Sequence, residues 1–192
     1  DSGEPDALVQ DDEQLQELAS LINRAHGTYF IGCGTAGKVC LAGTYAFSKI
    51  AGKHVNHCIA SEFPNYEDFL TDQTLVIAVS QSGETADTLE ALATAKKHGA
   101  KVISILNVFG SSMMRQSDYS LLINAGPEKA VASTKAATGQ LAVLLLLAYA
   151  CVGKLEEGKK LLRKTASAAS SLLSEAFCAR VKGLAQKIKG KE

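Results

Sequence analysis

The chain has 192 residues, with 20 basic and 20 acidic side chains. A formal net charge of zero gives no bulk attraction to nucleic acid or to an anionic membrane, so we expect neither as a partner. Hydrophobic residues make up 46% and charged residues 21%, which is typical of a globular protein with one main core.

The cysteines and histidines point away from metal chemistry. Five cysteines are scattered along the chain without a Cys-x-x-Cys pair, and the four histidines show no i, i+4 pairing. We therefore expect no metal and no cofactor, and reduced thiols in a cytoplasmic protein. No signal peptide is visible, and the longest apolar run, Leu141 to Val152, is too short for a bilayer. The start, which lacks methionine, indicates a boundary within something larger.

The chain opens with an acidic segment, residues 1–11, that we expect to be flexible. Apolar residues at helical spacing predict a helix from about Glu13 to Ala25. Thr28 to Ile31 is typical of a first strand. A glycine-rich turn and a helix to about Ala51 follow, and a second strand is expected over His54 to Ile59.

The turn after the first strand matches G-x-G-x-x-G through Gly32, Gly34 and Gly37. This pattern suggests a dinucleotide site, but the acidic residue expected at the end of the second strand is missing there. The nearest candidate, Glu62, comes later. Close backbone approach to another phosphorylated ligand would use the same glycines, so both hypotheses stay open.

The most informative stretch follows the apolar run Leu75 to Val79, which predicts a buried third strand. It reads Ser80-Gln81-Ser82-Gly83-Glu84-Thr85 and precedes a helix over Ala86 to His98. In a parallel α/β sheet this point is the carboxyl edge, where ligands bind. Three hydroxyls beside unpaired helix N–H groups favour a phosphate. The alternative is that Ser82 simply caps the helix.

The remainder predicts two more strands and several helices. Pro64 to Asp72 is expected to be a polar connection, Val102 to Leu106 and Tyr119 to Ile123 are strands, and Ser112 to Arg115 is a short helix that could bring Arg115 near the strand ends. Ser133 or Thr134 is a candidate cap for a helix from Ala136 to about Val152. That helix is apolar on nearly every side, so we expect another domain or subunit to help cover it. Helix formers fill residues 154–192, with a break expected between Ser167 and Ser174.

Alternating strands and helices predict an α/β fold, a three-layer αβα sandwich around a five-stranded parallel sheet of flavodoxin-like type. A C-terminal helical extension is expected to follow it. The domain boundaries expected are 12–153 for the sandwich and 154–192 for the extension.

Four motifs together resemble a known family. Gly32-Cys33-Gly34-Thr35, Ala60-Ser61-Glu62-Phe63, Ser80 to Thr88 and Val131-Ala132-Ser133-Thr134-Lys135-Ala136 occur in the order and spacing of the sugar isomerase (SIS) domain. The resemblance is greatest to the first SIS domain of the glucosamine-6-phosphate synthase family, also called glutamine:fructose-6-phosphate aminotransferase (isomerizing). It covers the chain from about Asp12 onward.

The resemblance implies a site for a hexose 6-phosphate, either fructose 6-phosphate or glucosamine 6-phosphate. It implies that the phosphate lies on Ser80, Gln81, Ser82 and Thr85, that the turn with Thr35 and Ala36 forms the other side, and that Val131, Ala132 and Ser133 line the sugar end. The family usually has serine where this chain has Ala36, which removes one hydroxyl donor and implies weaker binding. Lys135 is expected to support the loop rather than to act chemically.

The resemblance also implies that a complete enzyme needs more than this chain. Such enzymes carry a glutamine-hydrolysing domain and a second SIS domain with the glutamate thought to move the proton between C1 and C2. We expect this chain to bind sugar phosphate without catalysis, as the first half of the isomerase part. The alternative is a stand-alone regulatory SIS module that senses sugar phosphate. A homodimer, or docking with a second SIS domain, is expected.

Overall fold

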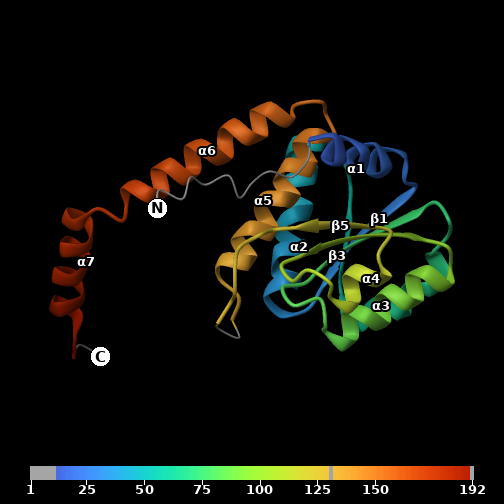
Figure 1. The fold of residues 1–192 in the computed structure, drawn as a ribbon, viewed down its shortest axis with the longest axis horizontal. Helices are drawn as coiled ribbons and strands as arrows, with labels where there is room; N and C mark the ends of the chain where they lie inside the picture. Colours follow the sequence, from blue (N-terminus) through green and yellow to red (C-terminus); the bar gives the residue numbers. More distant parts are fainter. Residues whose placement is uncertain (1–11, 130–131, 191–192) are drawn as a thin grey trace. The chain divides into compact units, whose positions relative to one another are not determined.

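The computed structural model describes residues 12–129 and 132–190. The chain divides into two compact units, Asp1–Leu155 and Glu156–Glu192. Figure 1 labels most of the elements of both units. Their order and bounds are α1 Asp12–Arg24, β1 Gly27–Gly32, α2 Gly34–Ala46, η1 Phe47–Ala51, β2 Asn56–Ile59, η2 Ala60–Phe69, β3 Thr74–Val79, α3 Ala86–Lys97, β4 Lys101–Leu106, α4 Ser112–Gln116, β5 Tyr119–Leu122, α5 Lys135–Ala150, α6 Leu155–Ser171 and α7 Glu175–Ile188.

The first unit is built on one parallel sheet with the strand order β2-β1-β3-β4-β5. Tyr29 of β1 pairs with Asn56 of β2 on one side and with Val76 of β3 on the other. The chain thus goes outward from β1 to β2 and returns to the other side of β1. This reversal between β1 and β3 makes a topological switch point, the place where open α/β sheets bind ligands. The predicted five-stranded flavodoxin-like sheet is confirmed.

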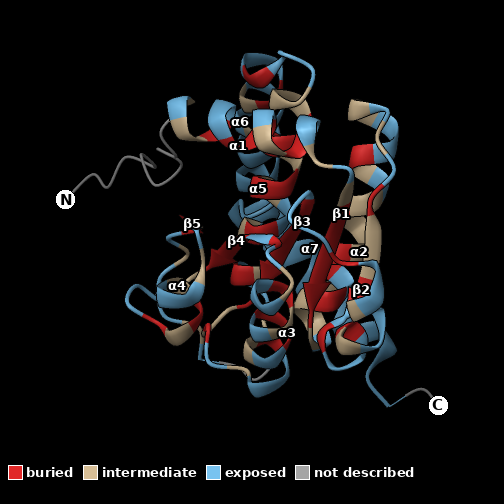
Figure 2. Ribbon diagram, turned by 90° about the vertical axis from the view of Figure 1, so that its right-hand side faces the viewer, coloured by how far each residue is buried: buried red, intermediate tan, exposed pale blue. Residues whose placement is uncertain are grey.

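Both faces of the sheet are covered, and the central strands β1, β3 and β4 are buried over nearly their whole length (Figure 2). On one face, Tyr29 and Val76 join a core with Leu92 of α3 and Met113 of α4. On the other face, the ring of Phe30 meets Phe47 edge-on, with 5.0 Å between ring centroids. With a core on each face, the sheet is the middle layer of a three-layer sandwich.

The segment after β2 differs from the prediction. The polar connection expected over Pro64 to Asp72 is in large part the 3-10 helix η2, with Pro64 inside it. Phe63 is fully buried and meets Tyr29 edge-on, with 5.5 Å between ring centroids. Burial of this aromatic anchor outweighs the polar, proline-bearing composition of the segment, which is why a sequence pattern missed the helix.

Helix α5 is covered largely by helices of its own unit. α1 and α2 both pack against it, and its Val143, Leu144 and Leu147 are buried. Gly43 lets α2 approach closely, because a Cβ there would lie 2.7 Å from Leu144 Cδ1. Leu141 keeps 38% of its surface exposed. Within this unit α1 and α2 supply most of the cover, and the expectation that another domain or subunit helps to cover α5 stays a prediction for its exposed remainder.

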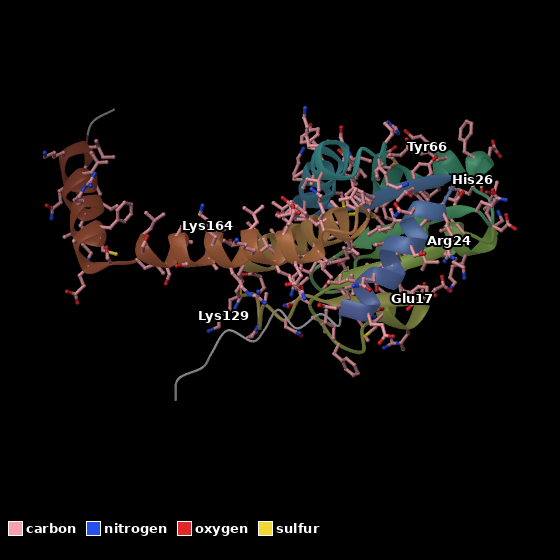
Figure 3. All side chains as sticks on the ribbon, turned by 90° about the horizontal axis from the view of Figure 1, so that it is seen from above. Glu17, Arg24, His26, Tyr66, Lys129 and Lys164 are labelled. Atoms are coloured by element: carbon pink, nitrogen blue, oxygen red, sulfur yellow. The ribbon has the colours of Figure 1, made fainter. Side chains whose placement is uncertain are left out.

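Helix α1 shows how this covering layer forms from an amphipathic sequence. Its buried residues face the core, while Glu17 and Arg24 are exposed, and Figure 3 labels both on this helix. The buried set recurs at a period of three to four residues, as packing one face of a helix requires. These residues are Leu15, Leu18, Ala19 and Ile22.

The second unit consists of most of α6 and all of α7. The break expected between Ser167 and Ser174 occurs after Ser171, and Ser174 Oγ accepts a hydrogen bond from the Phe177 N–H at 3.4 Å as the cap of α7. Within the described residues, no helix has both the length and the apolar character that crossing a membrane requires.

Candidate ligand-binding site

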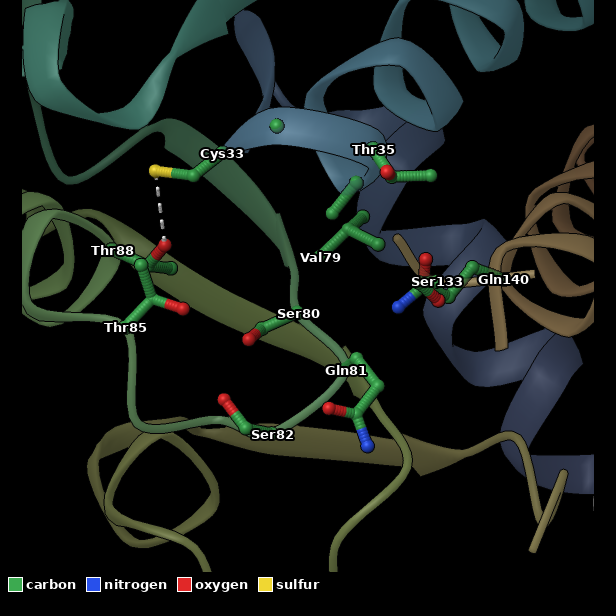
Figure 4. A pocket seen from close by; sticks show the side chains of 12 residues that line it. Cys33, Thr35, Val79, Ser80, Gln81, Ser82, Thr85, Thr88, Ser133 and Gln140 are labelled. Atoms are coloured by element: carbon green, nitrogen blue, oxygen red, sulfur yellow. Dashed lines mark hydrogen bonds between the residues drawn. The ribbon is translucent and has the colours of Figure 1, made fainter. Parts of the chain in front are cut away.

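A cavity of about 290 Å³ opens at the carboxyl ends of β1 and β3, at the switch point of the sheet (Figure 4). Its volume is near the lower end of the range for small-molecule sites. Seven of the nine residues predicted for the site line it. The lining residues are Cys33, Gly34, Thr35, Ala36, Val79, Ser80, Gln81, Ser82, Thr85, Thr88, Ser133 and Gln140.

Of the other two predicted residues, one is described and does not line the cavity. Ala132 is described and exposed, and it is not among the lining side chains. Val131 lies outside the described residues. Thr35 and Ala36 come from the start of α2, Ser80, Gln81, Ser82 and Thr85 from the loop after β3, and Ser133 from the segment before α5.

The serines of the loop after β3 are held with their protons available. Ser80 Oγ accepts a hydrogen bond from the Gly83 N–H at 3.0 Å, and Ser82 Oγ accepts one from the Glu84 N–H at 3.2 Å. A hydroxyl that accepts in this way keeps its own O–H for donation to something else. The loop thus presents hydroxyl donors at the cavity wall rather than spending them on the backbone.

The alternative that Ser82 caps α3 is wrong. The N-cap residue of α3 is Thr85, and its side chain makes no capping hydrogen bond. Instead, the Ser82 hydroxyl accepts from the N–H of Glu84, two residues on, and so closes a local turn before the helix. The hydroxyl of Thr85 therefore lines the cavity and does not cap the first N–H groups of α3.

Neighbouring loops hold this turn in place. The Met113 N–H donates to the Gly83 carbonyl at 3.0 Å, and the Asn107 N–H donates to the Gln81 carbonyl at 3.1 Å. The Glu84 carboxylate accepts from the Ser112 N–H at 2.7 Å, and this hydrogen bond lowers the pKa of Glu84 below its usual range. These bonds arrange the loop before any ligand arrives.

The cavity has a neutral lining. Cys33 is the one ionisable side chain among the lining residues that the structure describes. Its sulfur lies 3.8 Å from Thr88 Oγ1, the contact dashed in Figure 4, and 3.9 Å from Asp87 Oδ2. Positive potential at the site comes instead from the N-terminal ends of α2 and α3. Such a site favours an anion held by hydroxyl and backbone donors.

Two glycines of the G-x-G-x-x-G turn serve packing. A Cβ at Gly37 would lie 2.9 Å from the Gly32 carbonyl oxygen, so the pair lets α2 approach β1. Glu62 is exposed, accepts hydrogen bonds from Ser61 and Asn65, and does not line the cavity. The arrangement therefore gives no support to the dinucleotide hypothesis, which needs an acidic group for the ribose.

The side of the cavity near α5 holds two polar groups that have no partner in the described part of the chain. Ser133 Oγ and Gln140 Nε2 are shielded from solvent, and neither has a hydrogen-bond partner among the described residues. The sequence analysis does not single out Gln140, because it lies inside an apolar helix. The available signal was a long amide directly before the run Leu141 to Leu147.

Glu128, not Ser133 or Thr134, caps helix α5. Its carboxylate accepts from the N–H groups of Ala136 and Thr134, each at 3.1 Å, and these bonds hold its pKa below the usual range. Thr134 occupies the N-cap position but its side chain makes no capping bond.

Arg115, which the sequence suggested could lie near the strand ends, does not line the cavity. Its guanidinium donates to the Gly110 carbonyl and, at 2.9 Å, to Ser112 Oγ.

Known proteins share this sequence and fold. The SIS domain family matches residues 21–150. A glutamine–fructose-6-phosphate aminotransferase (isomerizing) of Clostridium tetani is 51% identical over 143 residues, which are 74% of this chain and 23% of that protein. The chain thus spans about a quarter of the length of the curated relatives it matches.

Two solved structures extend the comparison. The C-terminal domain of glucosamine-fructose-6-phosphate aminotransferase from Francisella tularensis aligns with a TM-score of 0.74 and 30% identity, covering 95% of this chain and 52% of that one. The Vibrio vulnificus NanR protein, solved with ManNAc-6P, aligns with a TM-score of 0.66 and 23% identity over 86% of this chain and 63% of that one. With its motifs, its strand order and the match over residues 21–150, the chain belongs to the SIS domain family.

Proposed function

We propose that this chain binds a hexose 6-phosphate, fructose 6-phosphate or glucosamine 6-phosphate, in the cavity between β1 and β3. The carrying observation is that Ser80 and Ser82 accept backbone hydrogen bonds and so keep their protons for an anion. Relatives named glutamine–fructose-6-phosphate aminotransferase support the choice of sugar phosphate. In this proposal the phosphate lies on the loop after β3.

The same cavity supports binding without chemistry by this chain alone. Among the described lining residues no carboxylate, imidazole or amine is present that could move a proton between sugar carbons. We therefore propose that the chain is the first half of the isomerase part of a larger aminotransferase. The reaction of the whole protein would convert fructose 6-phosphate to glucosamine 6-phosphate with ammonia from glutamine.

A titration calorimeter tests the binding proposal with fructose 6-phosphate, glucosamine 6-phosphate and NAD. We expect both sugar phosphates to bind and NAD not to bind. Ser82→Ala should weaken sugar-phosphate binding by roughly 10- to 100-fold, the value of a hydrogen bond to a charged acceptor. Ala36→Ser should tighten it, because it supplies a hydroxyl at a lining position.

Ser167→Ala is the matched control, since Ser167 is an exposed serine of α6. Unchanged affinity in Ser82→Ala would contradict the phosphate assignment. Robust interconversion of fructose and glucose 6-phosphates by the purified chain would contradict the proposal that it binds without catalysis.

A stand-alone sensing module is the second candidate, and it uses the same cavity. The neutral lining suits ligand detection as well as half of an active site. The NanR protein solved with ManNAc-6P has the same fold. The two candidates differ in what the gene encodes beyond Glu192, where a second SIS half would favour the enzyme.

We also propose self-association or docking through the outer side of α5. Leu141 is 38% exposed there, although the rest of the helix is well covered. Sedimentation of the purified chain tests this, and we expect a dimer. A monomer that persists at high concentration would contradict self-association and leave docking with a second SIS domain as the remaining form of the proposal.

The free cysteines fit a cytoplasmic location, which we propose as well. All five are unpaired thiols, and burial raises the pKa of Cys40 well above its usual range and the pKa of Cys151 to about 11. Thiol titration after denaturation without reductant should therefore count five free groups. A lower count in freshly prepared protein would argue for an oxidising compartment.

A further inference from the structure

The cavity has a second polar end that the phosphate proposal does not use. Gln140 is 99% buried on α5, yet its Nε2 finds no acceptor among the described residues. Ser133 Oγ, which lines the same cavity, is in the same condition. Figure 4 shows both side chains on the α5 side, across from Ser80 and Ser82.

A buried amide nitrogen without an acceptor is unfavourable, because its N–H groups lose their hydrogen bonds to water without replacement. Most buried polar groups in folded proteins are paired, so an unpaired one calls for a partner that the protein alone does not supply. The position of Gln140 in the cavity wall indicates a ligand as that partner. An amide N–H is a neutral donor that fits the oxygen of a hydroxyl or carbonyl group.

We propose that Gln140 is a specificity-determining residue that donates from Nε2 to an oxygen of the sugar. Together with Ser133, it forms the hydroxyl-recognising end of the cavity, opposite the phosphate end. This inference rests on the proposed function, because it needs the phosphate to be held at the loop after β3. It adds an expected preference in affinity: the cavity should bind polyhydroxylated phosphate esters more tightly than simple alkyl phosphates.

The neutrality of this end determines which ligands it excludes. No charged side chain lines the cavity among the described residues, so a second phosphate or a carboxylate has no counter-ion at Gln140. A ligand with one phosphate and a neutral polyhydroxy chain matches both ends. Ethyl phosphate shares the phosphate and lacks the hydroxyls, which makes it the appropriate comparison ligand.

The test uses the complete chain and the variant Gln140→Met, which keeps the length of the side chain and removes the amide. Fructose 6-phosphate binding is measured by calorimetry, and ethyl phosphate binding by the rise in Tm at fixed ligand concentration. We expect Gln140→Met to lower the affinity for fructose 6-phosphate by about 2- to 10-fold and to leave the rise in Tm with ethyl phosphate unchanged. The Tm of the unliganded variant should equal or exceed that of the wild type.

Gln14→Met is the matched control. Gln14 is a glutamine of α1 whose Nε2 is paired, since it donates to the Ser120 carbonyl at 3.4 Å away from the cavity. This control should lower Tm and leave both ligands unaffected. It separates the general cost of replacing a glutamine amide from the specific effect at the cavity.

Unchanged fructose 6-phosphate affinity in Gln140→Met would overturn the inference. Equal weakening of both ligands together with a lower Tm would also overturn it, because that pattern marks a purely structural residue. If the wild type binds neither ligand, the proposed function fails and the inference fails with it. If the wild type binds both fructose 6-phosphate and ethyl phosphate, and Gln140→Met keeps the same ratio of the two affinities, the inference is overturned while the proposed function stands.

Discussion

Replacing Gly83 with alanine should destabilise the loop after β3 more than the same change at another left-handed glycine. Gly83 has φ of +70°, and a Cβ there would lie 2.3 Å from Ser111 Oγ and 2.7 Å from Ser111 Cβ. Ser111 is 3% exposed and accepts a hydrogen bond from the Met114 N–H as the cap of α4. Rotation of the hydroxyl can relieve the first contact but not the second.

The magnitude has two parts. An alanine held at positive φ costs about 1–2 kcal/mol. Inserting a methyl group into a filled space costs about 1–3 kcal/mol more. Gly83→Ala should therefore lower the free energy of unfolding by roughly 2–5 kcal/mol. Gly52 has φ of +62° with no atom within 4 Å of the added Cβ, so Gly52→Ala should show only the first part.

Urea unfolding followed by tyrosine fluorescence is the assay. The chain has no tryptophan, and all five of its tyrosines come before residue 156. The fluorescence therefore reports the unfolding of the first unit alone. A second change, Ser111→Gly, removes the two atoms that would lie within 3 Å of the new methyl group and leaves only an ordinary contact with Met113 Cβ at 3.4 Å. In the double variant the clash part should disappear, which a double-mutant cycle measures as a coupling of about 1–3 kcal/mol.

Two results would refute this reasoning. One is a Gly83→Ala variant that loses no more stability than Gly52→Ala, which would mean that the loop moves freely away from Ser111. The other is a Ser111→Gly change that does not relieve the destabilisation by Gly83→Ala, which would place its cause elsewhere. Either outcome would show that the loop after β3 is not held against α4 as tightly as its hydrogen bonds indicate.

Two further predictions concern carboxylates at helix starts. Glu128→Ala should lower Tm more than Thr134→Ala, because the carboxylate and not the hydroxyl accepts from the first N–H groups of α5; the opposite order in a thermal melt would contradict this. The folded pKa of Glu84 is lowered by the Ser112 N–H, so its contribution to stability is present above the unfolded pKa of about 4 and is lost as pH falls through the folded pKa. The difference in urea midpoint between wild type and Glu84→Gln should therefore narrow on acidification, and a constant difference across that range would exclude the role.

Much of this site follows from local sequence. The apolar run before Ser80 forms β3, and the serines and threonine after it line the cavity as expected. Strands buried on both faces and turns rich in glycine and serine carry their pattern within a few residues. The glycine-rich turn after β1 reaches the same cavity for the same reason: it directly follows a strand.

Other features depend on contacts between distant segments. The sequence of η2 does not reveal that Phe63 is buried against Tyr29. Nor does the loop before α5 reveal that Glu128 reaches the start of that helix, eight residues before Ala136. Leu141 to Leu147 indicate burial but not its source, which is largely α1 and α2.

The sequence by itself thus determined which residues end strands, which begin helices and which hydroxyls face a ligand edge. Only the tertiary structure decided that Gln140, sixty positions after Ser80, lines the same cavity. The reason is physical: local patterns reflect backbone geometry over one or two turns, whereas the strand order that reverses between β1 and β3 joins segments far apart in the chain. Packing of α5 on this unit brings the Nε2 of Gln140, which has no partner among the described residues, across the cavity from the serine loop.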